Sequence, residues 1–288
     1  MIHVVIPVHN RLEFTKTCLI SLRNQKKIKN LNIIVIDDGS NDGTFDYLTK
    51  NFTDITILKS DGSLFWCGAV NYGISHILKI YKTGDWVLLI NNDVQLNQDS
   101  IIELIKISEK KNRKVLTGAL TLSLKDKKTV IKSGTIVKSW FLNRTKHVFE
   151  GINYENISNY EPVNVDFLTA RCLLHPIEMI LEVGNYDSKT FIHYGGDDEF
   201  SMRIKKFGYS SFLCPTSFVF LNDTNSKKYE KNFFKNLYFT LFSKRSSSNL
   251  INKLLLTKKI VPAHAKITYF LIGILKSIYI FFKNEIYK

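Results

Sequence analysis

At 288 residues the chain is long enough to bury a substantial core, and its 44% hydrophobic and 23% charged residues are ordinary for a soluble globular protein. The formal net charge of +14 is uneven, because residues 225–288 hold 13 basic and 2 acidic side chains and contribute +11. This basic tail indicates an anionic surface as a partner, either a membrane or a nucleic acid. Four widely separated cysteines, with no Cys-x-x-Cys and no clustered His, argue against a zinc site or a disulfide framework and fit a reducing compartment.

Strands and helices alternate along the first 115 residues. Apolar runs predict strands at 2–8, 31–36, 55–58 and 86–90, and helical spacing predicts helices at 13–23, 44–50, 70–81 and 100–110. This alternation implies right-handed βαβ units and a parallel sheet. The first strand begins at once, with no basic segment and no long apolar segment before it, so we expect no secretory signal and a cytoplasmic location.

The pattern changes after residue 115. Strands or hairpins are predicted at 115–124, 130–140, 146–152, 163–174 and 210–220, and helices at 176–182 and 197–207. Several of these strands alternate polar and apolar residues, whereas the strands of the first half are continuously apolar. We therefore predict one α/β domain with a mixed sheet over residues 1–224, followed by a helical tail over residues 225–288.

The tail contains two segments, 233–243 and 267–282, in which Phe, Tyr, Ile and Leu are interleaved with Lys. The second segment includes Lys276 and is shorter than the roughly 20 apolar residues of a membrane-spanning helix. Basic, aromatic-rich helices are typical of the membrane interface, so we expect peripheral binding to an anionic membrane. The alternative is that these faces pack on the first domain or on a second copy of the chain. No nucleic-acid-binding motif accompanies them, which argues against nucleic acid as the partner.

Three polar clusters follow predicted strands. The first is at Asn91, Asn92 and Asp93, directly after the apolar strand 86–90. Ligands of open α/β sheets collect at the carboxyl ends of the strands, so Asp93 is a candidate ligand or metal site. A single carboxylate beside a nucleotide diphosphate suits Mg²⁺ or Mn²⁺, which keep waters and take phosphate oxygens. The alternative is that Asp93 only caps the helix that begins near Asp99.

The second cluster combines Pro7-Val-His-Asn10 with Asp37-Asp38-Gly39-Ser40, at the ends of two neighbouring strands. A carboxylate there can accept hydrogen bonds from a ribose or a base. A dinucleotide dehydrogenase would need a glycine-rich turn after the first strand, and the sequence has Val-His-Asn-Arg instead. The alternative, an Asp-Gly turn with an Asx cap, accounts for Gly39 but not for the doubled aspartate.

The third cluster is His193-Tyr-Gly-Gly-Asp197-Asp198-Glu199, followed by Arg203. Three consecutive carboxylates repel one another, but the dipole at a helix N-terminus favours negative charge. One interpretation is therefore an acidic first turn, with Glu199 and Arg203 as an i,i+4 pair. The other is a catalytic carboxylate base, presented from a segment whose glycines permit close approach.

Together these clusters resemble the motifs of family 2 glycosyltransferases with the GT-A fold, from Ile2 to about Asn225. The matching segments are Val5-Ile-Pro-Val-His-Asn10, Val35-Ile-Asp-Asp-Gly-Ser-Asn-Asp42, Leu64-Phe-Trp-Cys-Gly-Ala-Val-Asn-Tyr-Gly73, Leu89-Ile-Asn-Asn-Asp-Val94, Val183-Gly-Asn-Tyr-Asp187, His193-Tyr-Gly-Gly-Asp-Asp-Glu-Phe-Ser-Met-Arg203 and Phe207-Gly-Tyr209. The chain looks most like the bacterial rhamnosyltransferase-like members that build cell-surface polysaccharides. The resemblance implies a Rossmann-like mixed sheet flanked by helices, with the helical tail as a C-terminal extension.

The resemblance also implies roles for residues that bind a nucleotide-diphosphate sugar. By this comparison, Pro7, Asn10 and Asp38 line the base and ribose. Gly68 and Asn71 lie beside the nucleotide or the donor sugar, and Asn92 belongs to the same donor site. Further contacts to donor or acceptor are implied for Trp66, Arg171 and His193.

For the chemistry, Asp93 matches the last position of the family's Asp-x-Asp motif and would hold Mg²⁺ or Mn²⁺. Asn91 occupies the first carboxylate position of that motif, so the metal would meet fewer charges. Asp197 matches the Asp of the family's Glu-Asp pair and would be the catalytic base, while Gly196 replaces the Glu. This departure leaves the choice between Asp197 and Asp198 open.

The resemblance implies an inverting transfer of a sugar to a hydroxyl of a glycan or lipid-linked acceptor, at the inner face of the cytoplasmic membrane. A nucleotidyltransferase is the rival enzyme, but it would normally carry a glycine-rich, basic loop after the first strand. A non-catalytic sugar- or membrane-binding module of the same fold is a rival of another class. The joint presence of Asp38, Asp93 and Asp197 argues against such a module.

Overall fold

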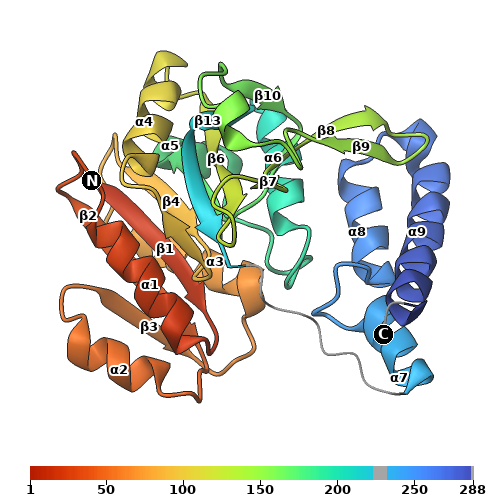
Figure 1. The fold of residues 1–288 in the computed structure, drawn as a ribbon, viewed down its shortest axis with the longest axis horizontal. Coiled ribbons are helices and arrows are strands. Elements are labelled where there is room, and N and C mark those ends of the chain that lie inside the picture. Colours follow the sequence, from red (N-terminus) through yellow and green to blue (C-terminus); the bar gives the residue numbers. More distant parts are fainter. Residues whose placement is uncertain (223–231, 287–288) are drawn as a thin grey trace.

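A mixed sheet with helices on both faces forms the centre of the computed structural model, which describes residues 1–222 and 232–286 (Figure 1). The strand order is β10-β13-β6-β12-β4-β1-β2-β3, with β5 added to β13 and β7 added to β6. The bounds of these strands are β1 Ile2–Val8, β2 Leu31–Asp38, β3 Thr56–Ser60, β4 Trp86–Ile90, β5 Val94–Leu96, β6 Val115–Ser123, β7 Val130–Ile131, β10 Val163–Val165, β12 Cys172–Pro176 and β13 Ser210–Leu221.

The sheet has a parallel part and a mixed part, as the sequence predicts. Strands β4, β1, β2 and β3 are parallel, and β12 runs antiparallel between β4 and β6. All five residues of β4 are buried, because β1 and β12 flank the strand and helices cover both faces. The predicted mixed α/β class is therefore confirmed, and the carboxyl end of β4 lies in the middle of the sheet.

Helices pack on both sides of this sheet. Their bounds are α1 Leu12–Arg23, α2 Thr44–Asn51, α3 Phe65–Ile77, α4 Ser100–Lys110, α5 Ile177–Val183, α6 Gly196–Lys205, α7 Phe233–Phe242, α8 Leu250–Ile260 and α9 Lys266–Ile286. One core cluster joins the sheet to α3, α5 and α6, and the other joins it to α1 and α4. The starts of α3 and α6 thus lie on the same side of the sheet.

Several predicted elements differ from the structure, and two of the differences have a clear cause. Helix α3 begins at Phe65 rather than at residue 70, because the carboxylate of Asp38 accepts hydrogen bonds from the N–H groups of Leu64 and Phe65. The single strand predicted at 163–174 is three short strands, β10, β11 (Phe167–Leu168) and β12. They separate because β10 pairs with β13, β11 with the neighbouring small sheet, and β12 with β4 and β6.

The tail forms a helical layer beside the sheet, with α9 packed on α7 and α8 (Figure 1). The hairpin of β8 (Gly134–Ser139) and β9 (Arg144–His147) extends to this layer. There the Asn143 side chain donates to the carbonyl oxygen of Tyr269 at 3.0 Å, and Trp140 packs on the Tyr269 ring. Helix α9 extends the predicted segment 267–282 at both ends, whereas α8 is not predicted. The domain boundary predicted at residue 224 lies outside the described residues.

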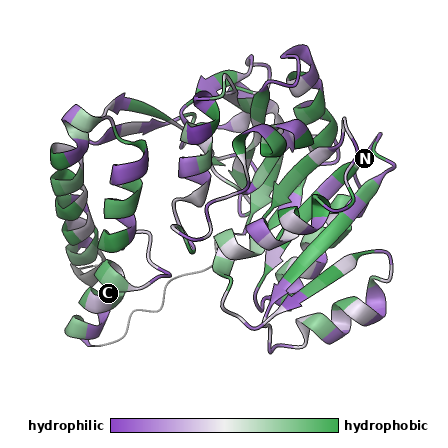
Figure 2. Cartoon of the chain, turned by 180° about the vertical axis from the view of Figure 1, so that it is seen from behind, coloured by the Kyte–Doolittle hydropathy of each residue, from purple (hydrophilic) through white to green (hydrophobic). Residues whose placement is uncertain are grey.

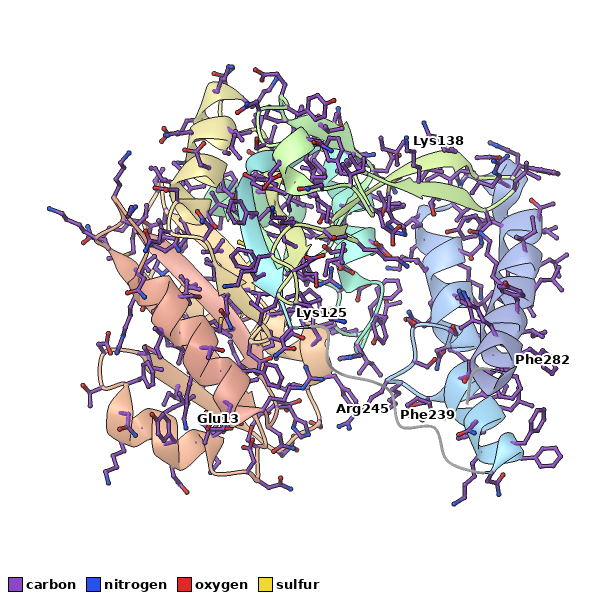
Figure 3. All side chains as sticks on the ribbon, viewed as in Figure 1. Glu13, Lys125, Lys138, Phe239, Arg245 and Phe282 are labelled. Carbon is purple, nitrogen blue, oxygen red and sulfur yellow. The ribbon has the colours of Figure 1, made fainter. Side chains whose placement is uncertain are left out.

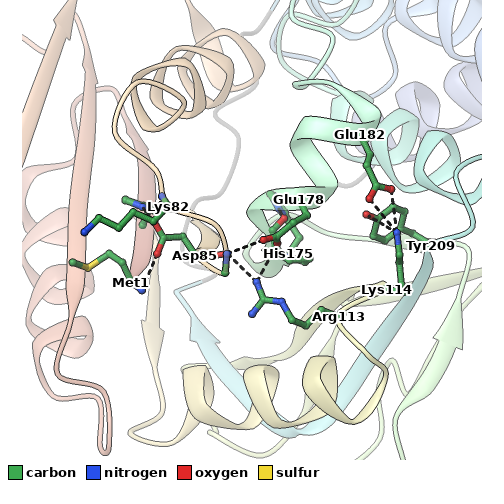
Figure 4. A network of polar contacts seen from close by, with 12 residues as sticks. Met1, Lys82, Asp85, Arg113, Lys114, His175, Glu178, Glu182 and Tyr209 are labelled. Atoms are coloured by element: carbon green, nitrogen blue, oxygen red, sulfur yellow. Dashed lines mark hydrogen bonds and ion pairs between the residues drawn. The ribbon is translucent and has the colours of Figure 1, made fainter.

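A polar network closes the edge of the sheet at which β1 and β4 begin (Figure 4). The carboxylate of Asp85 accepts from the N-terminal ammonium at 2.9 Å, from His3 Nε2 at 3.0 Å and from the Lys82 N–H at 2.7 Å. Burial favours the neutral acid, but these donors outweigh it and lower the pKa of Asp85 to about 2. Only 7% of its side chain is exposed, so the ionised form stabilises the fold.

We therefore expect Asp85→Asn to lower the free energy of unfolding by about 1–3 kcal/mol at neutral pH, because an amide cannot replace the charge-assisted hydrogen bonds. The pKa of Asp85 in the folded state thus lies below the ordinary value of an aspartate, about 3.9. The stabilisation is thus present above about pH 4 and is lost as the pH falls towards 2. Urea denaturation at several pH values measures both effects. Asp54→Asn, at an exposed ion pair with Arg23, is the control and should change little.

Candidate active site

The segment after β4 directs its three polar side chains to different places. Asn91 Oδ1 accepts a hydrogen bond from Trp66 Nε1 at 2.9 Å, and this bond joins β4 to the start of α3. The buried Asn92 side chain donates to Thr15 Oγ1 of α1 at 3.0 Å. Both amides are thus engaged within the fold, and Asp93 is the charged group at this end of the strand.

The Asp93 carboxylate has one occupied oxygen and one open oxygen. Oδ2 accepts from Arg11 Nη1 at 3.3 Å, while the buried Oδ1 has no hydrogen-bond partner in the described part of the chain. The side chain also borders a hollow of about 180 Å³ beside α1. A buried carboxylate oxygen without a donor is costly unless a cation or donor meets it. Asp93 therefore fits a divalent cation that takes its other ligands from phosphate and water, although the described residues contain no group of three His, Cys, Asp or Glu side chains suited to a metal.

The second carboxylate group lies at the start of α6. Gly195 precedes the helix with a φ of 89°, a conformation that favours glycine. Asp197 Oδ2 accepts from the N–H of Ala170 at 3.3 Å, and Asp197 Oδ1 accepts from the N–H of Asp198 at 3.1 Å. These donors fix the Asp197 carboxylate in its place at the helix N-terminus.

The two neighbouring aspartates differ in their electrostatic environments. Burial raises the pKa of Asp197, whereas the Ala170 and Asp198 N–H groups and the charge of Arg171 oppose that rise. Burial and the charge of Asp197 raise the pKa of Asp198 to about 8. Within the pair, the N–H donors and Arg171 therefore favour ionisation of Asp197, whereas Asp198 holds a proton at neutral pH. An ionised carboxylate is what a general base requires, so the geometry favours Asp197 for that role.

Residues 170 and 171 connect the two carboxylates. The N–H of Ala170 donates to Asp197, and the carbonyl oxygen of Arg171 accepts from the N–H of Asn91 at 3.3 Å. Burial lowers the pKa of the Arg171 guanidinium, while the charges of both Asp93 and Asp197 raise it. Asp93 and Asp197 therefore both act electrostatically on one guanidinium, although they are far apart in the sequence.

The loops after β1 and β2 form the adjoining edge of the site. Asn10 has a φ of 59°, its N–H donates to Ser40 Oγ at 2.7 Å, and its Oδ1 accepts from the N–H of Asn41 at 2.8 Å. Pro7 is half-buried within β1. The buried Asp38 carboxylate accepts from Ser60 and from the N–H groups before α3, and so holds Phe65 at a φ of 53°. The predicted contacts of these residues to a nucleotide stay predictions.

Two other predicted donor contacts lie on α3. The side chain of Asn71 donates to the carbonyl oxygen of Tyr186 at 2.7 Å, which fixes the segment before α6. Gly68 is half-buried on the first turn, where a Cβ would lie 3.2 Å from the Cβ of Leu64. The first turn of α3 carries Trp66, which packs edge-on against Tyr186. Through these contacts, α3 joins the carboxyl end of β4 to the segment before α6.

Residues 3–172, more than half of the chain, match the sequence profile of glycosyl transferase family 2. The chain belongs to glycosyl transferase family 2. A curated relative, the "Uncharacterized glycosyltransferase MG060 homolog" of Mycoplasma pneumoniae (strain ATCC 29342 / M129 / Subtype 1), is 28% identical over 153 residues, 51% of this chain and 48% of that protein. The chain thus spans about half the length of that relative.

Solved structures share the fold of this family 2 chain at low sequence identity. GalNAc-T7, crystallised with UDP, GalNAc and Mn²⁺, matches with a TM-score of 0.63 and 14% identity over 95% of this chain and 54% of that one. The mannosyltransferase PcManGT from Pyrobaculum calidifontis, in complex with GDP-Man and Mn²⁺, matches with a TM-score of 0.54 and 14% identity over 96% and 68%. The predicted GT-A fold is thereby confirmed.

Sequence reasoning missed residues that the tail places at this family 2 site. Arg245, in the loop between α7 and α8, reaches towards the start of α3, with its Cζ 5.8 Å from the Phe65 ring centre (Figure 3). Burial lowers the pKa of His193, and the charges of Arg245 and Arg11 lower it further. Burial and the charge of Asp198 raise the pKa of Tyr269 in α9 to about 12. The one feature of the sequence that could have drawn attention to Arg245 is that it is the single arginine among the lysines of residues 225–288.

The glycine in place of the family's glutamate has a local steric reason. A Cβ on Gly196 would lie 2.7 Å from Cys67 Sγ of α3. We expect Gly196→Ala to lower the free energy of unfolding by about 1–3 kcal/mol, because this clash forces α3 and α6 apart. Cys67→Ala removes the sulfur and should restore part of that loss in the double variant. A double-mutant cycle by urea denaturation checks the coupling; additive effects of the two substitutions would contradict it.

Proposed function

We propose that this protein is an inverting glycosyltransferase that moves a sugar from a nucleotide-diphosphate donor to a hydroxyl of a glycan or lipid-linked acceptor in surface-polysaccharide synthesis. The observation that carries the proposal is that residues 170 and 171 connect the Asp197 carboxylate to the segment that bears Asp93, in a chain of family 2. One carboxylate has an open oxygen for a cation, and the other accepts hydrogen bonds from two main-chain N–H groups that hold it in place.

In the proposed reaction Asp197 accepts the proton of the acceptor hydroxyl. The hydroxyl oxygen forms a bond to the anomeric carbon as the bond from that carbon to the diphosphate oxygen breaks, and the nucleoside diphosphate leaves with the electron pair. Attack on the face opposite the leaving group inverts the anomeric centre. Arg11 and Arg171 lie beside the carboxylates and favour the negative charge of the diphosphate.

A divalent cation, Mg²⁺ or Mn²⁺, fits the donor set of this site. Asp93 would hold it through the oxygen that lacks a partner, and the bound cation would supply Lewis-acid stabilisation of the leaving diphosphate. Hydrogen bonds of the two preceding residues keep Asp93 in place. The main chain of Asn91 bonds to Arg171, and the side chains of Asn91 and Asn92 bond to α3 and α1.

A donor panel tests the proposal. Purified protein, incubated with Mn²⁺ and single nucleotide sugars, should slowly hydrolyse one of them and gain thermal stability from the same compound. A nucleotidyltransferase would instead release pyrophosphate from a nucleoside triphosphate and a sugar phosphate. A non-catalytic module would bind a sugar or nucleotide sugar without turnover. Either of those results would overturn the assignment.

A further inference from the structure

A second, basic cavity lies away from the candidate active site. It has a volume of about 610 Å³ and lies between α6, the end of α8 and the start of α9. Five cationic side chains line it together with one carboxylate, that of Glu199. The cationic side chains are Arg203, Lys206, Lys258, Lys259 and Lys266.

Three of these cations are engaged within the protein. Arg203 forms an ion pair with Glu199 at 2.9 Å and donates to the carbonyl oxygen of Val183 at 2.7 Å. Lys259 Nζ forms an ion pair with Asp187 Oδ2 at 3.0 Å, and Lys266 Nζ donates to the carbonyl oxygen of Lys258 at 3.0 Å. The side chains of Lys206 and Lys258 form no ion pair with a described residue and leave the cavity with surplus positive charge. Such a concave basic site fits a phosphate group.

An exposed apolar stripe begins at the edge of this cavity. Helix α9 starts at Lys266, and large apolar residues then recur every three or four positions along its outer face. They are Ile267, Leu271, Leu275, Tyr279 and Phe282, each at least half exposed. Phe234 and Tyr238 of α7 are also strongly exposed. Figure 2 shows the apolar colouring along α9, and Figure 3 shows Phe282 at the outer edge of the layer.

We propose that this surface docks on an anionic membrane: the cavity binds the phosphate of a lipid headgroup, and the α9 stripe enters the interface. Lys266 lines the cavity and Ile267 begins the stripe, so the two features adjoin at the start of α9. Basic and apolar faces that adjoin in this way are typical of interfacial helices. The docking is independent of the proposed sugar transfer, although it would bring the active site close to a lipid-linked acceptor.

Helix α9 lies on the surface in this proposal rather than crossing the bilayer. By length and composition alone, residues 263–283 would suffice for a span. However, Lys276 donates to the carbonyl oxygen of Asn143, and the hydroxyl of Ser277 donates to that of Ser248 at 3.1 Å. A spanning helix would break these bonds and separate from α8. A parallel orientation keeps them and buries only the exposed stripe.

Charge also favours a membrane over a second copy of the chain as the occupant. The described tail, like the whole protein, is strongly basic, so two copies facing each other through this surface would repel. An anionic lipid surface instead attracts each juxtaposed lysine. A free phosphate ion would match the cavity alone and would leave the apolar stripe exposed to water.

Vesicle flotation tests the electrostatic part. The full-length protein should bind vesicles of phosphatidylglycerol and phosphatidylcholine, but not vesicles of phosphatidylcholine alone, and high salt should weaken the binding. Lys206→Glu with Lys258→Glu should lower partitioning at least about 30-fold. The control is Lys50→Glu with Lys110→Glu, which makes the same charge change on α2 and α4. Equal losses in the two double variants would overturn the cavity's role.

A second pair of variants tests the stripe. Leu271→Ser with Leu275→Ser should lower partitioning by more than about tenfold, whereas Ile20→Ser with Leu181→Ser, also exposed and apolar, should not. Thermal stabilisation by inorganic phosphate without vesicle binding would overturn the proposal in favour of a free-anion site. A dimer that the α9 variant dissociates, again without vesicle binding, would overturn it in favour of self-association. Donor hydrolysis in solution should be unchanged in all four variants, which separates this test from that of the proposed function.

Discussion

Asp197→Asn should lower sugar transfer by about 10²–10⁴-fold while the protein folds normally and still binds its donor. The amide has nearly the same shape, and its one oxygen can still accept the N–H bond of Ala170, so only the local bond from the N–H of Asp198 is lost and the start of α6 stays in place. It cannot take a proton from the acceptor hydroxyl. Single-turnover transfer with excess enzyme measures the chemical step, and calorimetry measures donor binding. Turnover close to that of the wild type would remove Asp197 as the base.

Asp198→Asn is the matched control, and it should change sugar transfer little. Burial and the charge of Asp197 raise the pKa of Asp198 to about 8, so the amide replaces a carboxyl group that is protonated at neutral pH. Because the side chain that accepts the proton is unchanged, the maximum transfer rate should stay close to that of the wild type. A loss as large as that of Asp197→Asn would instead assign the proton transfer to Asp198.

The strands of the parallel sheet could be predicted from the sequence, because strands that are buried on both faces consist of continuous apolar residues. The boundaries between β10, β11 and β12 could not be predicted, since each of these strands pairs with a different partner strand. The start of α3 likewise depends on Asp38, which is distant in the sequence. Helix α8 was not predicted because its leucines and lysines do not form a clear apolar face in the sequence. Its apolar side is defined only by its packing on α9.

The candidate site, like the fold, could be predicted from the sequence only in part. The motifs around Asp93 and Asp197 were found because carboxylates after an apolar strand, or after two glycines, are chemically conspicuous. The sequence does not show which of three polar side chains after β4 remains available. In the structure Trp66 engages Asn91 and Thr15 engages Asn92, which leaves Asp93. Arg245 was missed because it belongs to no motif, and the tail brings it to the site only through folding.

Asp93→Ala should abolish the dependence of donor binding on Mn²⁺ and raise the donor's dissociation constant at least about tenfold, the effect of losing roughly 1.4 kcal/mol. The carboxylate is the one charged ligand that the segment after β4 offers, because the two residues before it are amides. Isothermal titration of donor with and without Mn²⁺ measures the change. Donor binding that stays metal-dependent in this variant would show that the cation is held elsewhere.

Arg11→Gln is a control that should change the affinity for Mn²⁺ in the direction opposite to that of Asp93→Ala. Its guanidinium forms an ion pair with Asp93 Oδ2 at 3.3 Å, so a divalent cation arriving at this carboxylate must compete with it. Arg11→Gln removes the competitor, and Mn²⁺ should then bind to the protein without donor more tightly than in the wild type. Asp93→Ala and Arg11→Gln therefore change Mn²⁺ affinity in opposite directions. A general disturbance of the loops would weaken binding in both, so the opposite signs identify Asp93 as the residue that meets the metal.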